Sequence, residues 1–337
     1  MAKKKVLCFG ELLLRVSPAT GSNAEKQPVQ VYVGGAEANV ASALAAWEVP
    51  VKYCTALPDN FMSQHMIRYL EYQGIYTSSI IKRGKRIGLY YLDRGADLKG
   101  GVAYDREHSS FSELELGVID WDSILQDVSW LNLSTISPAL NANVAAVCLE
   151  AVKAASEKSI TISIDLNYRN RLWNGSNRNP LDVIPQLVEH CDVIMGNIWS
   201  ANMMLGTTLH QELIHNRTKE GFLEHAALTS QEIIERFPKC QYVANTFRFD
   251  GESSNILYYT SLYSNNNLYT SAEYNTKGVI DRSGSGDCFM AGLIYGIYNK
   301  HSLQDVVDYA TAAAFGKLQE QGDSTWQDQL TVRNAKK

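Results

Sequence analysis

The sequence lacks closely spaced cysteine pairs, and it lacks long apolar runs. Its six cysteines are scattered without a Cys-x-x-Cys pair, so we expect free thiols in a reducing compartment and neither a disulfide framework nor a zinc site. No apolar run approaches the roughly 20 residues that span a bilayer, and the first one, residues 6–10, is typical of a buried strand rather than a signal peptide. We therefore expect a cytoplasmic protein without a membrane partner. The seven histidines show no ligand spacing, and His210, His215 and His225 fall in a polar segment where we expect them to be solvated.

A strong excess of charge of either sign is also missing. The 337 residues include 31 basic and 36 acidic side chains, which gives a net charge of −5 at pH 7. Nucleic acids and anionic membranes select for positive charge, so we expect neither as a partner. With 45% hydrophobic and 20% charged residues, the composition is typical of a globular protein with a sizeable core. We predict one large α/β domain over residues 1–337 that carries a small subdomain.

From residue 128 onward the sequence alternates regularly between short apolar runs and helical segments. Strands predicted at 131–134, 160–165 and 193–195 alternate with helices predicted at 141–156, 180–190 and 200–205. This order is typical of a mostly parallel sheet covered by helices on both faces, which is a doubly wound fold of three layers. Further strands are predicted at 5–10, 51–56, 242–244, 256–259 and 268–270, with helices at 61–73 and 302–319. The polar stretch 210–225 is predicted to be a surface insertion.

A short loop, Gly284-Ser285-Gly286-Asp287, precedes an apolar segment of near-helical spacing at 289–297. Glycines at a helix start let backbone N–H groups converge on an anion, and the helix dipole favours negative charge there. An acid at the same place repels phosphate. Asp287 is therefore best explained as a base that takes a proton from a hydroxyl attacking the phosphate. On spacing alone, a tight turn with an acid in the first helical turn explains the loop equally well.

A second glycine-opened helix is predicted near the amino end. Residues 29–33 alternate between apolar and polar, as in a half-exposed strand, and Gly34-Gly35-Ala36-Glu37-Ala38-Asn39-Val40-Ala41 then opens an alanine-rich helix. Gly35 allows the backbone to approach a ligand closely, and Asn39 carries an amide along the same helix start. Taken alone, this segment favours a tightly packed strand–turn–helix without a ligand.

Together the two motifs resemble the signatures of the ribokinase-like (PfkB) carbohydrate kinases, Gly-Gly-Ala-x-x-Asn-Val-Ala and Gly-Ala-Gly-Asp, and they occur in the family's order. The resemblance covers nearly the whole chain. It implies a ribokinase-like fold with a small β-sheet lid, formed by about residues 12–34 and 86–112. It also implies an ATP-dependent sugar kinase with Asp287 as general base, and not a P-loop kinase, because the Gly-x-x-x-x-Gly-Lys-Ser/Thr stretch is absent.

The cofactors implied by the resemblance are ATP and Mg²⁺, and a monovalent cation stays open as a third. In the family the lid often pairs with a second copy. Its exposed apolar face would need burying, so we expect a homodimer through the lid.

Two arginines point to an acidic sugar. Arg169 follows the strand predicted at 160–165, at the sheet edge where ligands bind in open α/β folds, and Arg106 lies on the predicted lid. A guanidinium group matches a carboxylate in bidentate fashion, whereas a neutral sugar needs no such pair. Arg106 lies between Asp105 and Glu107 in the sequence, so a surface ion pair is an open alternative for it.

Segments 31–40, 165–169 and Gln321-Gly322-Asp323 resemble the 2-keto-3-deoxygluconate kinase branch of the family. That resemblance implies phosphorylation of the terminal hydroxyl of 2-keto-3-deoxygluconate to give 2-keto-3-deoxy-6-phosphogluconate. The substrate contacts it implies are Gly35 and Asn39 for hydroxyls, Tyr90 and Tyr104 for the pocket wall, Arg106 and Arg169 for the carboxylate, and Asp287 and Asp323 beside the reacting hydroxyl.

The nucleotide side departs from the family pattern. Asn197 is kept, but Ser200 stands where many members have a Glu that helps to organise magnesium, so the metal ligands stay open. The loop at 245–251 has one glycine where two are usual, and Ser285 replaces the usual Ala. The expected ATP and phosphate contacts are Asn167, Asn197, Thr246, Arg248, Gly251, Gly284, Ser285 and Gly286.

Two other functions stay open on the sequence. The first is a fructokinase or another neutral-sugar kinase of the same family, whose sugar affinity would barely depend on Arg169. The second is a sugar-sensing pseudoenzyme, which Ser200 and the altered nucleotide loop favour. The intact Asp287 with its flanking glycines argues against the pseudoenzyme. The sequence leaves open whether the 4-epimer of the sugar is also accepted.

Overall fold

The computed structural model describes residues 3–18, 26, 28–93, 101–174, 177–250, 255–276 and 278–337. The strands are β1 Lys5–Phe9, β2 Leu13–Ser17, β3 Gln30–Gly34, β4 Val51–Leu57, β5 Tyr76–Lys82, β6 Leu89–Leu92, β7 Val102–Asp105, β8 Val128–Ser134, β9 Thr161–Asp165, β10 Val193–Gly196, β11 Tyr242–Asp250, β12 Ile256–Ser264, β13 Asn267–Thr270 and β14 Tyr274–Thr276. The helices are α1 Ala36–Ala46, α2 Phe61–Tyr72, α3 Trp121–Ile124, α4 Ile136–Leu140, α5 Ala142–Glu157, α6 Asn170–Asn174, α7 Pro180–Val188, α8 Ile198–Leu205, α9 Gln211–His215, α10 Lys219–Arg236, α11 Ser285–Tyr298, α12 Leu303–Lys317 and α13 Gln329–Ala335. Within these ranges no helix is both long and apolar enough to cross a bilayer.

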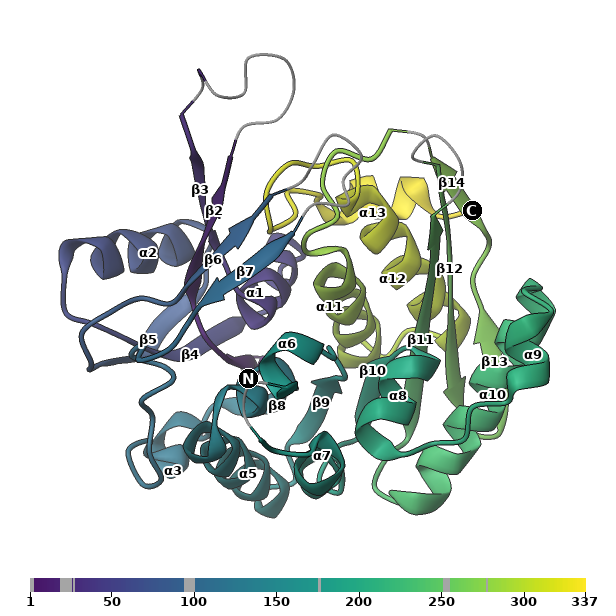
Figure 1. The fold of residues 1–337 in the computed structure, drawn as a ribbon, viewed down its shortest axis with the longest axis horizontal. Helices are drawn as coiled ribbons and strands as arrows, with labels where there is room; N and C mark the ends of the chain where they lie inside the picture. Colours follow the sequence, from purple (N-terminus) through teal and green to yellow (C-terminus); the bar gives the residue numbers. More distant parts are fainter. Residues whose placement is uncertain are drawn as a thin grey trace.

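The larger sheet confirms the predicted doubly wound α/β fold (Figure 1). Its strands run in the order β13-β12-β11-β10-β9-β8-β1-β4-β5, and neighbours from β11 to β5 are parallel. Strands β12, β13 and β14 extend the sheet in antiparallel fashion. Because alternate residues of a strand point to opposite faces, Val6 and Cys8 of β1 pack into one core, and Leu7 and Phe9 pack into the other.

Helices cover both faces of this sheet and make it the middle of three layers. Helices α1, α2, α11, α12 and α13 contribute to one core, and α3, α5, α7, α8 and α10 contribute to the other. Helices α1 and α11 also contact each other, so the two glycine-opened helices predicted from the sequence are neighbours.

A separate small sheet has the order β3-β2-β6-β7 and lies on the side of α1 and α2 (Figure 1). Its register places Arg15 opposite both Tyr32 and Tyr90, and Tyr90 opposite Tyr104. Directly paired residues share a face of a sheet, so these four side chains form one row across the same face. Arg15 is fully buried in that row.

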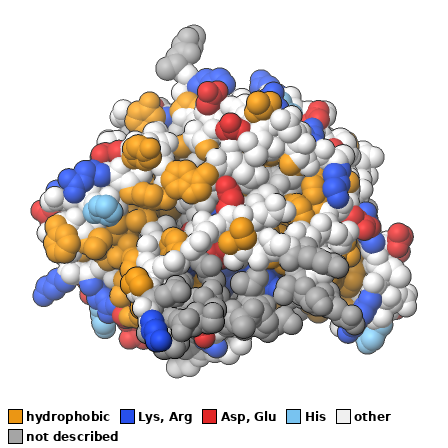
Figure 2. Space-filling model, turned by 90° about the horizontal axis from the view of Figure 1, so that it is seen from above, with side chains coloured by type: hydrophobic (Ala, Val, Ile, Leu, Met, Phe, Trp, Pro, Cys, Tyr) orange, Lys and Arg blue, Asp and Glu red, His pale blue; other side chains and the backbone are white. Residues whose placement is uncertain are grey.

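The opposite face of the small sheet carries an apolar row. Val31 pairs with Val16, Val16 with Tyr91, and Tyr91 with Ala103. Val31 and Tyr91 are 57% and 42% exposed. Seen from above in Figure 2, apolar side chains gather on the left of the molecule, which is the side where α2 and the small sheet lie in Figure 1.

Residues 211–220 lie at the surface, as predicted for the polar stretch 210–225, but the prediction that His225 is solvated was wrong. The segment contributes α9 and the first part of α10, and His225 is fully buried. The Nε2 atom of His225 accepts a hydrogen bond from the backbone N–H of His210 at 3.0 Å, and burial lowers the pKa of His225. The many polar residues of α10 make the apolar periodicity of its sequence weak, although one face of the helix is buried. That face includes Phe222, Ala226 and Ile233. His215 is exposed, as expected.

Candidate active site

The helix α11 begins with the predicted glycine turn. Gly284 caps the helix in the left-handed conformation, with φ at 77°. A Cβ atom at this position would lie 1.9 Å from the carbonyl oxygen of Asp323, so both the backbone angle and the space require glycine. The amides of the first turn have no partners within the helix and are available to an anion.

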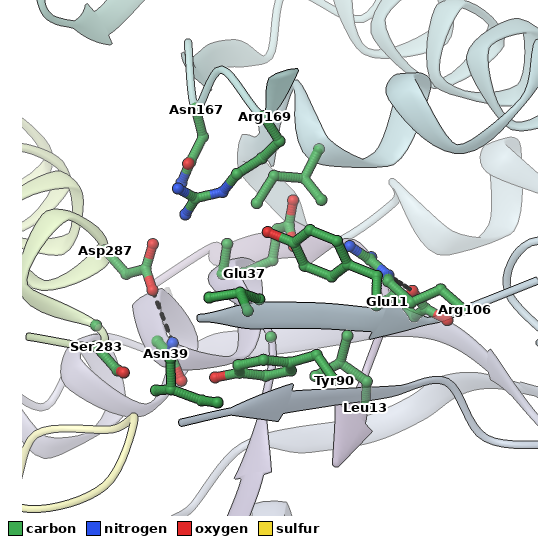
Figure 3. A pocket seen from close by; sticks show the side chains of 17 residues that line it. Glu11, Leu13, Glu37, Asn39, Tyr90, Arg106, Asn167, Arg169, Ser283 and Asp287 are labelled. Atoms are coloured by element: carbon green, nitrogen blue, oxygen red, sulfur yellow. Dashed lines mark hydrogen bonds and ion pairs between the residues drawn. The ribbon is translucent and has the colours of Figure 1, made fainter. Parts of the chain in front are cut away.

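Asp287 lies in this first turn and is 8% exposed. Asn39, in the first turn of α1, donates a hydrogen bond from Nδ2 to Oδ2 of Asp287 at 2.7 Å (Figure 3). Burial raises the pKa of Asp287 to about 8, and nearby Asp165 and Glu37 add to the rise, whereas the Asn39 hydrogen bond opposes it. A carboxyl group with a pKa near neutrality can both take up and release a proton at physiological pH.

Two cavities meet at Asp287. The first, of about 190 Å³, lies between the small sheet and the start of α1. The second, of about 390 Å³, lies along residues that follow β9 and β10 and along the turn before α11. The residues that line both are Asn167, Arg169, Ser283, Gly284 and Asp287. Groups bound in the two cavities would therefore meet at Asp287 and the free amides of α11.

The first cavity gathers most of the predicted substrate contacts. Its lining includes Gly35, Asn39, Tyr90, Tyr104, Arg106, Arg169 and Asp287. Tyr90 and Tyr104 belong to the row that they form with Arg15 and Tyr32, and we call this face of the small sheet its inner face. In Figure 3, Asn167 and Arg169 lie toward Asp287, whereas Arg106 lies beside Glu11 at the other end.

Arg106 forms a buried ion pair, so the open alternative of a surface pair was wrong. Its Nε donates to Oε2 of Glu11 at 2.5 Å, and the two side chains are 7% and 1% exposed. Asp105 pairs instead with Arg86. Glu11 was not identified as a site residue from the sequence. It lies just beyond the end of a buried strand, at the carboxyl edge of a parallel sheet, and an acid at that place is a recognisable signal of a ligand site.

Glu37 is a second acid of the cavity to which the sequence motifs assigned no role. Its Oε1 accepts hydrogen bonds from the backbone N–H and the hydroxyl of Ser134, at 2.8 and 2.6 Å. Burial raises the pKa of Glu37. With Glu11 and Asp287, it makes the cavity rich in carboxyl groups.

Comparison with known proteins decides the class of site. The model of the family described as "pfkB family carbohydrate kinase" matches residues 3–329. This chain belongs to the PfkB family of carbohydrate kinases. The resemblance of the two glycine motifs to that family is thereby confirmed.

Three relatives of this PfkB chain carry related names. A crystal structure of 2-dehydro-3-deoxygluconokinase from Thermotoga maritima is similar with a TM-score of 0.90 and 31% identity, over 99% of this chain and 98% of that one. A 2-dehydro-3-deoxygalactonokinase from Haloferax volcanii is 28% identical over 57% of this chain and 60% of its own length, which is less than two thirds. A 5-dehydro-2-deoxygluconokinase from Geobacillus thermodenitrificans is 26% identical over 84% of this chain and 77% of its own length.

The structure places Asp323 behind the first cavity of the PfkB chain rather than in its lining. Asp323 is 3% exposed. Its Oδ1 forms an ion pair with Arg15 Nη1 at 2.6 Å, and its Oδ2 accepts a hydrogen bond from the hydroxyl of Tyr90 at 2.9 Å. Asp323 therefore contacts the cavity wall through Tyr90 and does not line the cavity itself.

The second cavity of the PfkB chain gathers the predicted nucleotide contacts Asn167, Asn197, Thr246, Arg248, Gly284, Ser285 and Gly286. The remaining one, Gly251, lies outside the described residues. Asn197 also caps α8, because its Oδ1 accepts from the backbone N–H of Ser200 at 2.8 Å. Its Nδ2 group is then the donor that remains for a ligand.

The metal ligands are not evident from acidic clusters. In the described part of the chain, no group of three or more His, Cys, Asp or Glu side chains is arranged to hold a metal ion. Besides Asp287, the carboxyl group of Asp165 lines the second cavity, where Asn167 Nδ2 donates to its Oδ2 at 3.2 Å. Burial raises the pKa of Asp165 to about 7.

Proposed function

We propose that this PfkB chain transfers the γ-phosphoryl group of ATP to the terminal hydroxyl of 2-keto-3-deoxygluconate. The observation that carries the proposal is the place of Asp287, where the two cavities meet beside the N-terminus of α11. A sugar in the first cavity and a triphosphate in the second would bring a hydroxyl, a phosphoryl group and a base together. Positioning of this kind supplies most of the rate enhancement in phosphoryl transfer.

Asp287 has one oxygen available for the proton. Because Asn39 binds Oδ2, Oδ1 is the atom that would take up the proton of the sugar hydroxyl. The O–H bond breaks, the sugar oxygen bonds to the γ-phosphorus, and the bond from phosphorus to the oxygen of ADP breaks. The amides of Gly284, Ser285 and Gly286 would donate to the phosphoryl oxygens as their charge redistributes.

In this proposal Arg169 is the group that would hold the carboxylate of an acidic sugar. Arg106 is already paired with Glu11, so its charge is largely compensated. Arg169 carries its charge into the space that both cavities share. Glu11 and Glu37 would repel a sugar carboxylate unless a guanidinium group compensates for them.

The second cavity fits ATP with Mg²⁺. Arg248 and Arg282 add positive charge to its lining, beside the amides of α11, and both suit a triphosphate. Asp165 would supply a carboxylate oxygen to the metal, which otherwise binds phosphate oxygens and water. When bound, Mg²⁺ neutralises phosphate charge.

A coupled ATP-consumption assay over a panel of acidic and neutral sugars tests the proposal. We expect turnover of 2-keto-3-deoxygluconate and little turnover of fructose. Turnover of fructose alone would overturn it in favour of a neutral-sugar kinase, and binding without any turnover would favour a sugar sensor. The relative named 5-dehydro-2-deoxygluconokinase favours a second candidate, so the panel includes 5-dehydro-2-deoxygluconate and the galactonate epimer.

We also propose that the small sheet acts as a lid over the sugar and pairs with a second copy of this chain. The inner row of the sheet lines the first cavity through Tyr90 and Tyr104. The outer row exposes Val31 and Tyr91 to water, and a contiguous apolar row of this kind is stabilised by a partner surface.

A further inference from the structure

Arg15 joins the small sheet to the turn that opens α11. It lies in β2 and is fully buried. Its Nη1 donates to the hydroxyl of Ser283 at 2.7 Å, and its Nη2 donates to Oδ2 of Asp281 at 2.9 Å. The guanidinium group also stacks over the ring of Tyr32, with its carbon 4.1 Å from the ring centroid. One side chain of the small sheet therefore holds two residues of the phosphate-side turn.

Asp281 connects Arg15 to the backbone of the turn and to Gly322. Its Oδ1 accepts from the backbone N–H of Ser283 at 3.0 Å, and its Oδ2 accepts from the N–H of Gly322 at 3.2 Å. Burial would make an unpaired guanidinium or carboxylate costly. The single guanidinium group of Arg15 pairs with the carboxyl groups of both Asp281 and Asp323, so the geometry of each depends on the other two.

The sugar side is tied to the same guanidinium group. Tyr90 lines the first cavity and donates from its hydroxyl to Asp323, which pairs with Arg15. A continuous series of contacts thus runs from Tyr90 through Asp323 and Arg15 to Ser283. Ser283 in turn lines both cavities.

We propose that Arg15 is a positioning residue that couples sugar binding in the first cavity to nucleotide binding in the second. The inference rests on the proposed assignment of sugar and ATP to these cavities, but not on which sugar is bound. A sugar that fixes Tyr90 also fixes Asp323 and the guanidinium group, and this fixes the turn on which the phosphates rest. Coupling between sites is reciprocal, so each ligand should tighten the binding of the other.

The guanidinium group suits this role because its nitrogens form a rigid planar fork. Nη2 of Arg15 contacts Asp281, and Nη1 contacts both Ser283 and Asp323. These partners come from two segments of the chain, the turn before α11 and the loop after α12. A lysine at this position would keep the charge but could not hold all three partners in fixed geometry.

The test is calorimetric titration of sugar into the full chain, with and without a saturating Mg²⁺ complex of adenylyl imidodiphosphate. The sugar is the one that the wild-type protein phosphorylates best. We expect the analogue to tighten sugar binding at least about fivefold in the wild type. In Arg15→Met this ratio should fall close to one, and in Arg15→Lys it should be intermediate.

Two further variants separate positioning from stability. Ser283→Ala removes one of the two contacts between Arg15 and the turn, the one to the residue that lines both cavities. It leaves no buried charge unpaired, so it tests the coupling even if Arg15→Met does not fold. Lys52→Met removes another buried cation, which pairs with Asp127 at 2.7 Å and also donates to the carbonyl of Ile124, apart from both cavities. It should lower the melting temperature and leave the coupling ratio unchanged.

A wild-type ratio of one would overturn the proposal, as would a wild-type ratio retained by folded Arg15→Met or Ser283→Ala. Failure of the proposed function has a different signature. If a neutral sugar is the one phosphorylated, the substrate assignment fails, and the coupling is measured with that sugar.

Discussion

Asn39 and Asp287 are 248 residues apart in the sequence and share a hydrogen bond of 2.7 Å. The bond joins the first turns of α1 and α11, which are the two helices that the glycine motifs open. It favours the charged form of Asp287, whereas burial and the neighbouring acids favour the neutral form. The balance leaves a carboxyl group whose pKa is near the pH at which it would act.

Asp287→Asn should abolish most phosphoryl transfer and leave sugar binding in place. One positioned base contributes about 10²–10⁴-fold to turnover, so kcat should fall by that factor. The amide keeps the shape of the side chain and can still contact Asn39. Steady-state kinetics and calorimetric sugar titration of the same preparation measure the two effects. Equal losses of turnover and sugar affinity would contradict a base and indicate a binding residue.

The raised pKa of Asp287 gives activity and stability opposite responses to pH. The base acts when charged, so kcat/KM should rise with pH up to about 8 and then level off. The pKa of an aspartate in an unfolded chain is about 4, so the folded protein binds the extra proton between about pH 4 and 8. The contribution of Asp287 to stability should therefore fall as the pH rises through that window.

Asp287→Asn serves as the control for this effect. It should remove both the rise in kcat/KM and this part of the loss of stability, so its melting temperature should exceed that of the wild type at pH 8. A shift on the order of 2 °C or more is expected. A flat kcat/KM profile from pH 6 to 9 in the wild type would contradict the raised pKa.

Local turn chemistry explains how much of the site could be predicted from sequence. Gly35 and Gly284 have positive φ. Glycine is the residue that adopts such angles readily, so its occurrence in the sequence indicates a turn at these positions. The strand and helix alternation predicted the sheet for a similar reason, because burial on both faces leaves continuous apolar runs. Asn39 and Asp287 each lie in the first helical turn after one of these glycines, so helix geometry alone places them.

Contacts between distant segments could not be predicted in this way. The pairing of Arg15 with Asp281 and Asp323 depends on how the small sheet rests on the larger domain, and nothing near Arg15 in the sequence signals it. Asp323 was expected beside the sugar because an acid after a glycine resembles the family pattern, yet Arg15 and Tyr90 hold it behind the cavity wall. His225 was missed because a helix with many polar residues gives a weak apolar pattern.

Arg169→Ala should discriminate between acidic and neutral substrates. A hydrogen-bonded charge contributes about 1.5–3 kcal/mol, which corresponds to a rise in KM of roughly 10- to 150-fold for 2-keto-3-deoxygluconate. For fructose the KM should barely change. The matched variant is Arg169→Lys, which keeps the charge without the fork and should recover part of the affinity. An equal rise in KM for both sugars would contradict carboxylate recognition.

Lys317 places an ammonium group of the protein itself next to Gly284, in the turn that opens α11. Its side chain is fully buried, and its Nζ donates to the carbonyl oxygens of Gly322 and Glu320 at 2.9 and 3.2 Å. A monovalent cation would seek carbonyl oxygens of this kind, so we expect activity to be the same in K⁺, Na⁺ and tetramethylammonium salts.

Lys317→Ala should lower kcat/KM about tenfold or more, which is equivalent to about 1.4 kcal/mol. Added K⁺ or NH₄⁺ should restore part of the activity by occupying the vacated position, whereas tetramethylammonium is too large to do so. Coupled assays at constant ionic strength measure both effects. A wild-type protein that requires K⁺ would contradict the prediction.

The outer face of the small sheet should hold two copies of this chain together. Tyr91→Asp places a charge in the middle of the apolar row formed with Val16 and Ala103. A charge buried in an apolar interface is costly, so the variant should be monomeric in light scattering at concentrations where the wild type is dimeric. Leu330→Asp is the control, because Leu330 is also exposed, at 65%, but lies on α13. Dissociation by both variants, or by neither, would argue against this face as the interface.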